Sequence, residues 1–154
     1  MIKIISENKL DYLPLLLEGD EQESAIAKYL DRGELFAMYD GDLKCVCVIT
    51  DEGSGVLEVQ NIATVERCRR QGYARALLDY VAENYKDRFD SIVLGTGDVP
   101  GVLTFYRKCG FVVTHRVADY FTTHYDRPMI EEGVLLKDKV YLRRDLHSTI
   151  TAIS

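Results

Sequence analysis

The spacing of apolar residues changes from segment to segment along the chain, and it predicts strands in some segments and helices in others. Short runs in which apolar residues alternate with polar ones, or follow one another directly, favour strands. These runs cover residues 1–5, 35–39, 44–50, 56–64, 91–96, 112–120 and 139–145. Apolar residues three or four positions apart favour amphipathic helices, which we expect over residues 10–17 and 23–30, from the end of the glycine turn near residue 74 to about residue 85, and roughly over residues 100–109. The pattern therefore predicts a mixed α/β (α+β) fold.

The connections between these segments predict how the strands pair. Asp40-Gly41 joins two strands at a tight hairpin turn, where an Asp-Gly pair supplies positive φ angles. The helix that ends at about residue 85 connects the strands 56–64 and 91–96, so we expect these two strands to run parallel. A second turn over residues 51–55 leads into the strand 56–64, so we expect the strands 35–39, 44–50 and 56–64 to form an antiparallel run.

Length and charge narrow the class of protein. The chain has 154 residues, which suits a single domain over residues 1–146 with a frayed tail over residues 147–154. A formal net charge of −6 argues against a nucleic-acid-binding protein, which needs clustered Lys and Arg, and a small or cationic partner fits better. No apolar stretch near the N-terminus is long enough for a signal peptide or a membrane span, so we expect no membrane association and a cytoplasmic protein.

The cysteines and histidines lack the spacing of a metal site. The four cysteines, at positions 45, 47, 68 and 109, include no Cys-x-x-Cys, and the three histidines are not paired. Cys45 and Cys47 should point to the same face of a strand. We therefore expect reduced, structural thiols and no metal.

The turn between the strand 56–64 and the helix after it carries the clearest chemical signal. The strand is followed by Arg69-Arg70-Gln71-Gly72-Tyr73-Ala74-Arg75, and the helix begins within this run. Gly72 and Ala74 keep the turn free of bulk, so that successive backbone N–H groups can converge on phosphate oxygens. The helix N-terminus and the arginines add positive charge there. The sequence predicts a site for a phosphate-bearing ligand at this turn.

This turn and a second block together resemble the GNAT superfamily of acyl-CoA-dependent acyltransferases. Arg69, Gly72 and Ala74 match the superfamily turn, Gln/Arg-x-x-Gly-x-Gly/Ala. Residues 105–111, Phe-Tyr-Arg-Lys-Cys-Gly-Phe, resemble its Phe/Leu-Tyr-x-Lys-x-Gly-Phe block. The resemblance covers nearly the whole chain, and it is similar in detail to a generic bacterial subgroup. It implies a mostly antiparallel, mixed sheet of seven strands flanked by about four helices, whose parallel central pair is splayed around acetyl-CoA.

The resemblance also implies a reaction, in which acetyl-CoA is the co-substrate and a primary amine attacks its thioester directly in a ternary complex. Glu58 lies where several members place a catalytic glutamate, and we expect it to take the proton of the amine. A strand glutamate near a sheet surface is also often simply solvated, and a water ordered by Asn61 is an alternative base. Tyr106 occupies the family position of the general acid for the leaving thiolate, although a tyrosine that packs a helix against a sheet would look the same. Backbone N–H groups near residues 62–65 should stabilise the oxyanion.

The residues expected to contact acetyl-CoA follow from the same resemblance. They are Ile62, Ala63, Thr64, Arg69, Arg70, Gln71, Gly72, Tyr73, Ala74, Arg75 and Asp98. Asp98 stands near the position where many members carry an asparagine that contacts the pantetheine arm, and it could instead cap the next helix.

The sequence does not identify the amine acceptor or the oligomeric state. A polyamine, an amino acid, an aminoglycoside and a protein N-terminus all fit the same cofactor machinery. His124 and Tyr125 lie in a long loop expected over residues 121–138, at the acceptor mouth. The alternative function is an acetyl-CoA-binding sensor or interaction protein without catalysis, and the presence of both Glu58 and Tyr106 favours the enzyme. Superfamily members often pair through their closing strands, so we expect a homodimer.

Overall fold

A seven-stranded sheet organises the chain in the computed structural model, which describes residues 1–20 and 22–147. Its strands are β1 Ile2–Ile5, β2 Glu34–Asp40, β3 Asp42–Asp51, β4 Val56–Thr64, β5 Ser91–Gly97, β6 Val112–Val117 and β9 Lys139–Asp145. They lie in the order β1-β2-β3-β4-β5-β9-β6. Only β4 and β5 pair in parallel, and all other neighbours are antiparallel. The predicted mixed sheet with a parallel central pair is confirmed.

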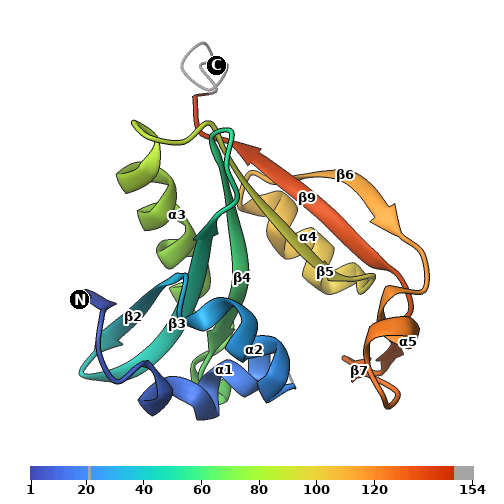
Figure 1. Cartoon of the computed structure of the whole chain (residues 1–154). Helices are drawn as coiled ribbons and strands as arrows, with labels where there is room; N and C mark the ends of the chain where they lie inside the picture. The colour runs from blue at the N-terminus through green and yellow to red at the C-terminus, as the bar shows by residue number, and fades with distance from the viewer. Residues whose placement is uncertain (21, 148–154) are drawn as a thin grey trace.

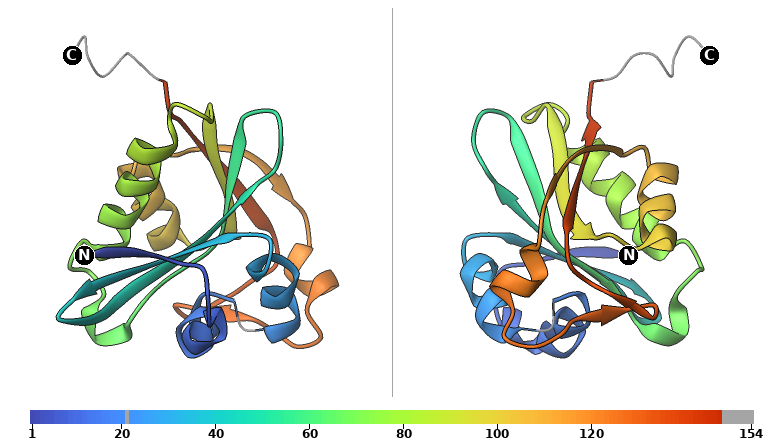
Figure 2. Two further views of the ribbon diagram at one scale, coloured as in Figure 1. Left: turned by 60° about the vertical axis from the view of Figure 1, so that its left-hand side comes forward. Right: turned by 90° about the vertical axis from the view of Figure 1, so that its right-hand side faces the viewer.

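Helices cover both faces of this sheet (Figure 1 and Figure 2). The α-helices are α1 Leu13–Gly19, α2 Glu23–Leu30, α3 Tyr73–Tyr85, α4 Pro100–Lys108 and α5 Tyr120–His124, and two 3-10 turns are η1 Lys9–Tyr12 and η2 Glu66–Cys68. One apolar core joins α3 and α4 to one face of the sheet. A second core joins α1 and α2 to the opposite face, over β2, β3 and the end of β4. The four predicted helices, α1 to α4, thus bury apolar residues of their sequence pattern in these two cores.

The central pair separates part of the way along its length. β4 and β5 are paired only from Val56 opposite Ser91 to Val59 opposite Leu94. On its other side, β4 has a bulge, because Val48 pairs with Asn61 while Ile49 pairs with Val59, which leaves Gln60 without a partner. From Gln60 onward, β4 has no strand on its β5 side, and we call this diverging part of the two strands the splay.

Three details differ from the sequence prediction. The strand expected over residues 112–120 ends at Val117, because Asp119 takes a left-handed conformation with φ 54° and begins α5. The loop expected over residues 121–138 contains part of α5 and a small hairpin, β7 Ile130–Glu131 with β8 Val134–Leu135. At the Asp40-Gly41 turn, only Gly41 has a positive φ angle. The tail expected over residues 147–154 lies outside the described residues apart from His147.

The described residues also bear on the expectations for membranes and cysteines. No helix among them is long and apolar enough to cross a membrane. Cys45, Cys47, Cys68 and Cys109 are all buried and free. Cys45 and Cys47 both pack in the core under α3 and α4, which confirms that they share a face of β3.

A buried chain of polar groups fixes α1 and α2 to the central strand. Asn61 Nδ2 donates to Leu16 O over 2.8 Å and to Tyr29 Oη over 3.0 Å, and Tyr29 Oη donates to Asp20 Oδ2 over 3.3 Å. A Cβ atom at Gly19 would overlap Asn61 Oδ1, so only glycine lets α1 approach the amide this closely. The helices are therefore held in register with β4 beside the bulge.

Removing the Tyr29 hydroxyl should loosen this anchor. We expect Tyr29→Phe to lower the free energy of unfolding by about 1 to 2 kcal/mol, because buried polar partners lose a hydrogen bond. Tyr12→Phe is the matched control, since its hydroxyl meets Tyr39 Oη over 2.8 Å in a half-buried pair that water can replace. Urea denaturation of both variants checks this, and equal losses would contradict it.

Candidate active site

The splay exposes backbone groups in the middle of the sheet. Because pairing with β5 ends at Val59, the β5-facing groups of residues 60–64 have no strand partner. The sequence placed these free amides near residues 62–65, and the structure starts the unpaired edge two residues earlier, at the bulge. Ile62 packs toward the α3 side of the sheet and Ala63 toward the α1 side, so their backbone rather than their side chains lines the splay. Thr64 Oγ1 lies 3.5 Å from Cys45 Sγ.

At the end of β4, the turn into α3 presents an open helix N-terminus. Gly72 is the N-cap residue with φ 90°, and no side chain caps the helix. The amide of Ala76 donates to Gly72 O over 3.0 Å, so the amides of the preceding residues have no helical partner. Arg70 also has a positive φ of 65°, a conformation that non-glycine residues adopt at a cost of about 1 kcal/mol. Residues with positive and negative φ angles that follow one another turn successive backbone N–H groups toward one point, and such concave groups of donors bind anions.

The other residues expected at this turn surround it. Arg70, Gln71 and Arg75 are exposed, and Ala74 packs on the core of α3. Arg69 is exposed, with Nε 3.4 Å from Thr64 O and a guanidinium nitrogen 4.0 Å from Glu18. Tyr73 Oη donates to Asp40 Oδ2 over 3.0 Å, which ties the start of α3 to the β2–β3 turn. The structure therefore gathers the turn residues at one end of the splay, as the sequence predicts.

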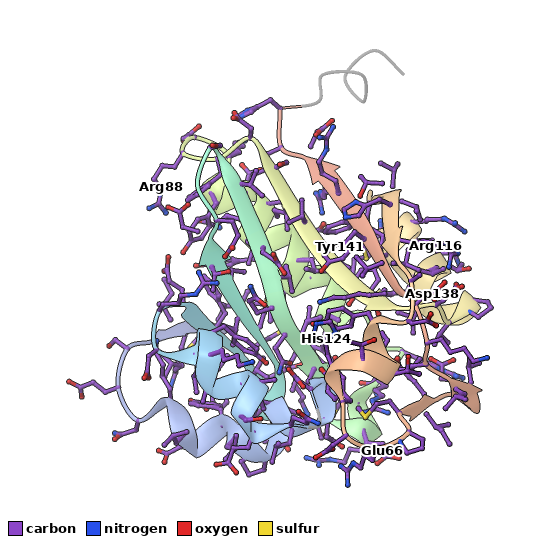
Figure 3. The ribbon with its side chains drawn as sticks, turned by 45° about the vertical axis from the view of Figure 1, so that its right-hand side comes forward. Glu66, Arg88, Arg116, His124, Asp138 and Tyr141 are labelled. Atoms are coloured by element: carbon purple, nitrogen blue, oxygen red, sulfur yellow. The ribbon has the colours of Figure 1, made fainter. Side chains whose placement is uncertain are left out.

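Asp98 lies apart from that turn, between β5 and α4. Its carboxylate accepts a hydrogen bond from Arg116 Nη1 at 2.7 Å. The Arg116 guanidinium also lies 3.6 Å from the Asp138 carboxylate, and Figure 3 labels both residues. The N-cap residue of α4 is Val99, and no side chain caps that helix. Asp98 thus holds β6 to the end of β5, and the capping role considered from the sequence is not what it does here.

Glu58 lies on β4 just before the splay, on the face away from α3 and α4. Its neighbours Leu57 and Val59 point into the α3 and α4 core, so Glu58 points to the opposite face. It is half-buried beside Thr50 on β3 and Val93 on β5. Burial raises the pKa of the Glu58 carboxyl above its ordinary value, and the positive charge of Lys139 opposes that shift. A raised pKa suits a carboxylate that exchanges protons near neutral pH.

Tyr106 lies on the other face of the sheet, in the core of α3 and α4. It is buried on α4, with its ring packed edge-on against Phe105 at 5.1 Å and Phe111 at 5.8 Å between centroids. Burial raises the pKa of its phenol, so the hydroxyl keeps its proton. Within the described residues its hydroxyl makes no hydrogen bond to the protein. The Tyr106 ring therefore does pack α4 against the sheet, as the alternative considered from the sequence expects. This packing does not occupy the hydroxyl in a hydrogen bond to any described residue.

Sequence reasoning missed a cluster on the Glu58 face. Lys139 Nζ lies 4.3 Å from the Tyr120 ring centroid and 5.1 Å from that of Tyr141. Tyr120 stacks on His124 at 4.2 Å, and Tyr141 stacks on His115 at 4.6 Å. Figure 3 shows Tyr141 and His124 on this side of the sheet. These residues come from β6, α5 and β9. Their spacing along the sequence does not predict that the three elements lie close together.

The two residues expected at the acceptor mouth have different surroundings. His124 joins this cluster, and its Nδ1 lies 2.9 Å from Tyr120 O. Tyr125 Oη instead donates to Asp20 Oδ1 over 3.2 Å, which links the end of α5 to the connection between α1 and α2. Among residues 1–20 and 22–147, no group of three or more His, Cys, Asp or Glu side chains could hold a metal ion.

Comparisons with known proteins agree with this geometry. A model of the GNAT acetyltransferase domain matches residues 31–113. The chain is 33% identical over 148 residues to the uncharacterized N-acetyltransferase YvbK of Bacillus subtilis, covering 94% of this chain and 96% of that protein. Among solved structures, a GNAT family acetyltransferase from Elizabethkingia anophelis with acetyl-CoA bound has a TM-score of 0.88 and 28% identity, with 94% of this chain and 97% of that chain covered. A Bacillus subtilis acetyltransferase in complex with CoA has a TM-score of 0.85 and 33% identity at the same coverage.

The family model spans more than half of the chain, and the relative is similar over nearly its whole length. The chain belongs to the GNAT family of acetyltransferases.

Proposed function

We propose that this protein transfers the acetyl group of acetyl-CoA to a primary amine by direct attack in a ternary complex. The observation that carries the proposal is the splay itself, which has an open helix N-terminus at one end, with Glu58 on β4 just before it. Tyr106 lies on the other face of the sheet, in the α3 and α4 core. The two solved relatives that contain acetyl-CoA or CoA support the choice of co-substrate. A sensor would need the turn but neither of the two side chains.

The residues present fit the phosphate end of the co-substrate. The uncapped amides before Ala76 are donors for phosphate oxygens, and the exposed arginines beside them supply positive charge. A Cβ atom at Gly72 would meet no protein atom within 4 Å, so the space over the turn is open to a ligand. The proposed contacts here are Arg69, Arg70, Gln71, Gly72, Tyr73, Ala74 and Arg75.

The unpaired edge of β4 suits the extended pantetheine arm. An extended amide chain can add to a free strand edge through backbone hydrogen bonds. Ile62, Ala63 and Thr64 supply that edge. Asp98, at the end of β5, is the further proposed contact, and its carboxylate would be shared with Arg116. When bound, acetyl-CoA supplies the thioester.

Glu58 and the free amides act on the acceptor side of the reaction. An alkylammonium has a pKa of about 10, so a base must take its proton before the nitrogen can attack. Glu58 is the proposed base, because its raised pKa keeps a carboxylate basic in a half-buried place. The N–H groups of β4 from Gln60 onward stabilise negative charge on the carbonyl oxygen, a role worth several kcal/mol at preorganised donors.

Tyr106 is the proposed acid for the departing sulfur. Its phenol is protonated, free of protein hydrogen bonds and held by two aromatic contacts. A donor whose ring is already held in place needs little reorganisation during the reaction.

Cytoplasmic residence and pairing of two copies belong to the same proposal. Four buried, free thiols suit a reducing compartment. β6 is an edge strand of the sheet, and Val112, Val113 and Val117 are exposed on it, which offers apolar surface to a second copy.

The co-substrate site predicts a specific effect at Gly72. We expect Gly72→Val to weaken acetyl-CoA binding at least about 10-fold in a calorimetric titration, because the side chain enters the open space over the turn and strains a φ of 90°. Gly53→Val is the matched control, since Gly53 has φ 84°, equally open surroundings and a position at the far end of β4. Binding that falls equally in both variants would refute the site.

The base predicts a pH effect at Glu58. The wild-type kcat/KM should fall as pH drops through the raised pKa of Glu58, because the protonated carboxyl cannot accept a proton. We expect Glu58→Gln to lower kcat/KM roughly 100-fold between that pKa and the pKa of the amine, and to remove the acid limb of the profile. Glu34→Gln, on β2, is the control and should keep the wild-type profile. An unchanged acid limb in Glu58→Gln would shift the role to water.

If Tyr106 is the acid, loss of its hydroxyl should affect turnover and leave acetyl-CoA binding almost unchanged. We expect Tyr106→Phe to lower kcat roughly 100-fold while the Kd for acetyl-CoA changes little, since only the hydroxyl is lost. Tyr80→Phe on α3, whose half-buried ring contacts Phe36 edge-on at 6.0 Å, should retain turnover. Release of CoA thiol measures kcat, and wild-type turnover in Tyr106→Phe would remove this residue as the acid.

A further inference from the structure

Lys139 reaches across the sheet toward the proposed base. Its neighbours in sequence place it there, because Val140 and Leu142 point into the α3 and α4 core, so Lys139 and Tyr141 point to the Glu58 face. A Cβ atom at Gly95 would overlap Lys139 Cε and would lie 2.9 Å from Tyr141 Cε1. The lysine side chain therefore lies directly over β5, the strand between its own and that of Glu58.

Aromatic rings hold the ammonium in place. Lys139 Nζ lies over the rings of Tyr120 and Tyr141, at 4.3 and 5.1 Å from their centroids. Each ring is itself stacked on a histidine, His124 and His115 respectively. The position of Tyr120 is fixed in turn, since Phe121 N donates to Lys137 O over 2.9 Å and joins α5 to the segment before β9. The cation is thus oriented without an anionic partner.

The charge of Lys139 is not neutralised by the protein. No carboxylate of the described residues lies within 4 Å of its Nζ. Burial lowers the pKa of the Lys139 ammonium, but the Tyr141 and Tyr120 hydroxyls raise it by more, so the group is charged at neutral pH. Glu58 feels this charge without forming an ion pair with it. A half-buried cation and a half-buried carboxylate therefore face one side of the sheet and do not close on each other.

We propose that Lys139 binds the carboxylate of the acceptor, and that the acceptor is a free α-amino acid whose amino group lies at Glu58. This inference rests on the proposed acetyl transfer and names its substrate class. An amino acid carries an ammonium and a carboxylate, whose charges are opposite to those of Glu58 and Lys139 on this face of the sheet. A polyamine or an aminoglycoside would bring further positive charge toward Lys139, and a protein N-terminus has an amide where the carboxylate is needed.

Matched pairs of acceptors test the carboxylate directly. Tyrosine with tyramine, histidine with histamine, and leucine with isoamylamine differ only by that group. With saturating acetyl-CoA, we expect thiol release to give a kcat/KM at least about 10-fold higher for the amino acid of a pair, because a charge-assisted hydrogen bond is lost in the amine. Equal or better kcat/KM for the amines would overturn the inference.

Variants of Lys139 assign that preference to this residue. Lys139→Met should lower kcat/KM for the amino acid roughly 10- to 100-fold more than for the matched amine, because a change in the pKa of Glu58 acts on both acceptors and only the amino acid also loses a carboxylate contact. Lys139→Arg should restore part of the preference. Lys3→Met is the control, since Lys3 Nζ lies 5.0 Å from the Tyr39 ring centroid on the far edge of the sheet. A preference that persists in Lys139→Met would overturn the assignment. If thermal denaturation shows that Lys139→Met is unfolded, the wild-type pairs and Lys139→Arg decide.

The same experiment separates this inference from the proposed function. Transfer to amines without a carboxylate preference overturns the substrate class and leaves the acetyltransferase intact. No transfer to any member of the pairs, with acetyl-CoA still bound in calorimetry, also overturns the substrate class. No binding of acetyl-CoA overturns the proposed function, and the inference with it.

Discussion

The divergence of β4 from β5 leaves backbone donors and acceptors unpaired at the centre of a sheet, where almost every other such group is bonded. The bulge at Gln60 contributes to this, because it turns β4 relative to β3 and places Asn61 on the side of α1 and α2. Asn61 then becomes a buried anchor for those helices. One irregularity thus frees an edge of β4 and also secures the layer that covers its other side.

The two faces of the sheet divide the proposed chemistry between them. On one face, α3 and α4 supply the open turn and Tyr106 within a continuous apolar core. On the other face, Glu58 is half-buried, with Thr50 beside it and the charges of Lys139, Glu52 and Arg32 near it. In the proposed mechanism, the base and the acid therefore approach the reacting centre from opposite faces of the sheet. Burial raises the pKa of both the Glu58 carboxyl and the Tyr106 phenol. For Glu58 this makes the carboxylate a better proton acceptor, and for Tyr106 it keeps the hydroxyl protonated.

Glycines on β5 leave room for side chains of β9 and of the segment just before it. Gly95 leaves room for Lys139 and Tyr141, and Gly97 leaves room for Leu136. The result is a lysine whose counter-charge, Glu58, lies two strands away and does not pair with it. Charges that are kept apart in a half-buried place are unfavourable by themselves, and a ligand with both charges would relieve them. The hairpin of β7 and β8 and the short helix α5 support this arrangement through the small core of Val99, Met129 and Leu136.

The sequence by itself determined the elements and the turn before α3. Periodicity located the sheet strands and the four longer helices, because an element that buries one face must repeat its apolar residues at its own period. The contiguous run from Arg69 to Arg75 could be interpreted locally, since a strand, a glycine turn and a helix N-terminus need no distant partner. The same local reasoning failed for residues 112–138, where the left-handed Asp119 ends a strand that its apolar alternation would continue.

Only the tertiary structure decided which side chains share a face beside the splay. Glu58 and Tyr106 could be singled out in sequence, but their placement on opposite faces follows from the bulge and from the packing of α4. Lys139, Tyr120 and His115 come together because β9 lies between β5 and β6 and α5 folds back over it. Such contacts join residues far apart in the chain, and their physical cause is the pairing order of the strands, which no local pattern of residues encodes.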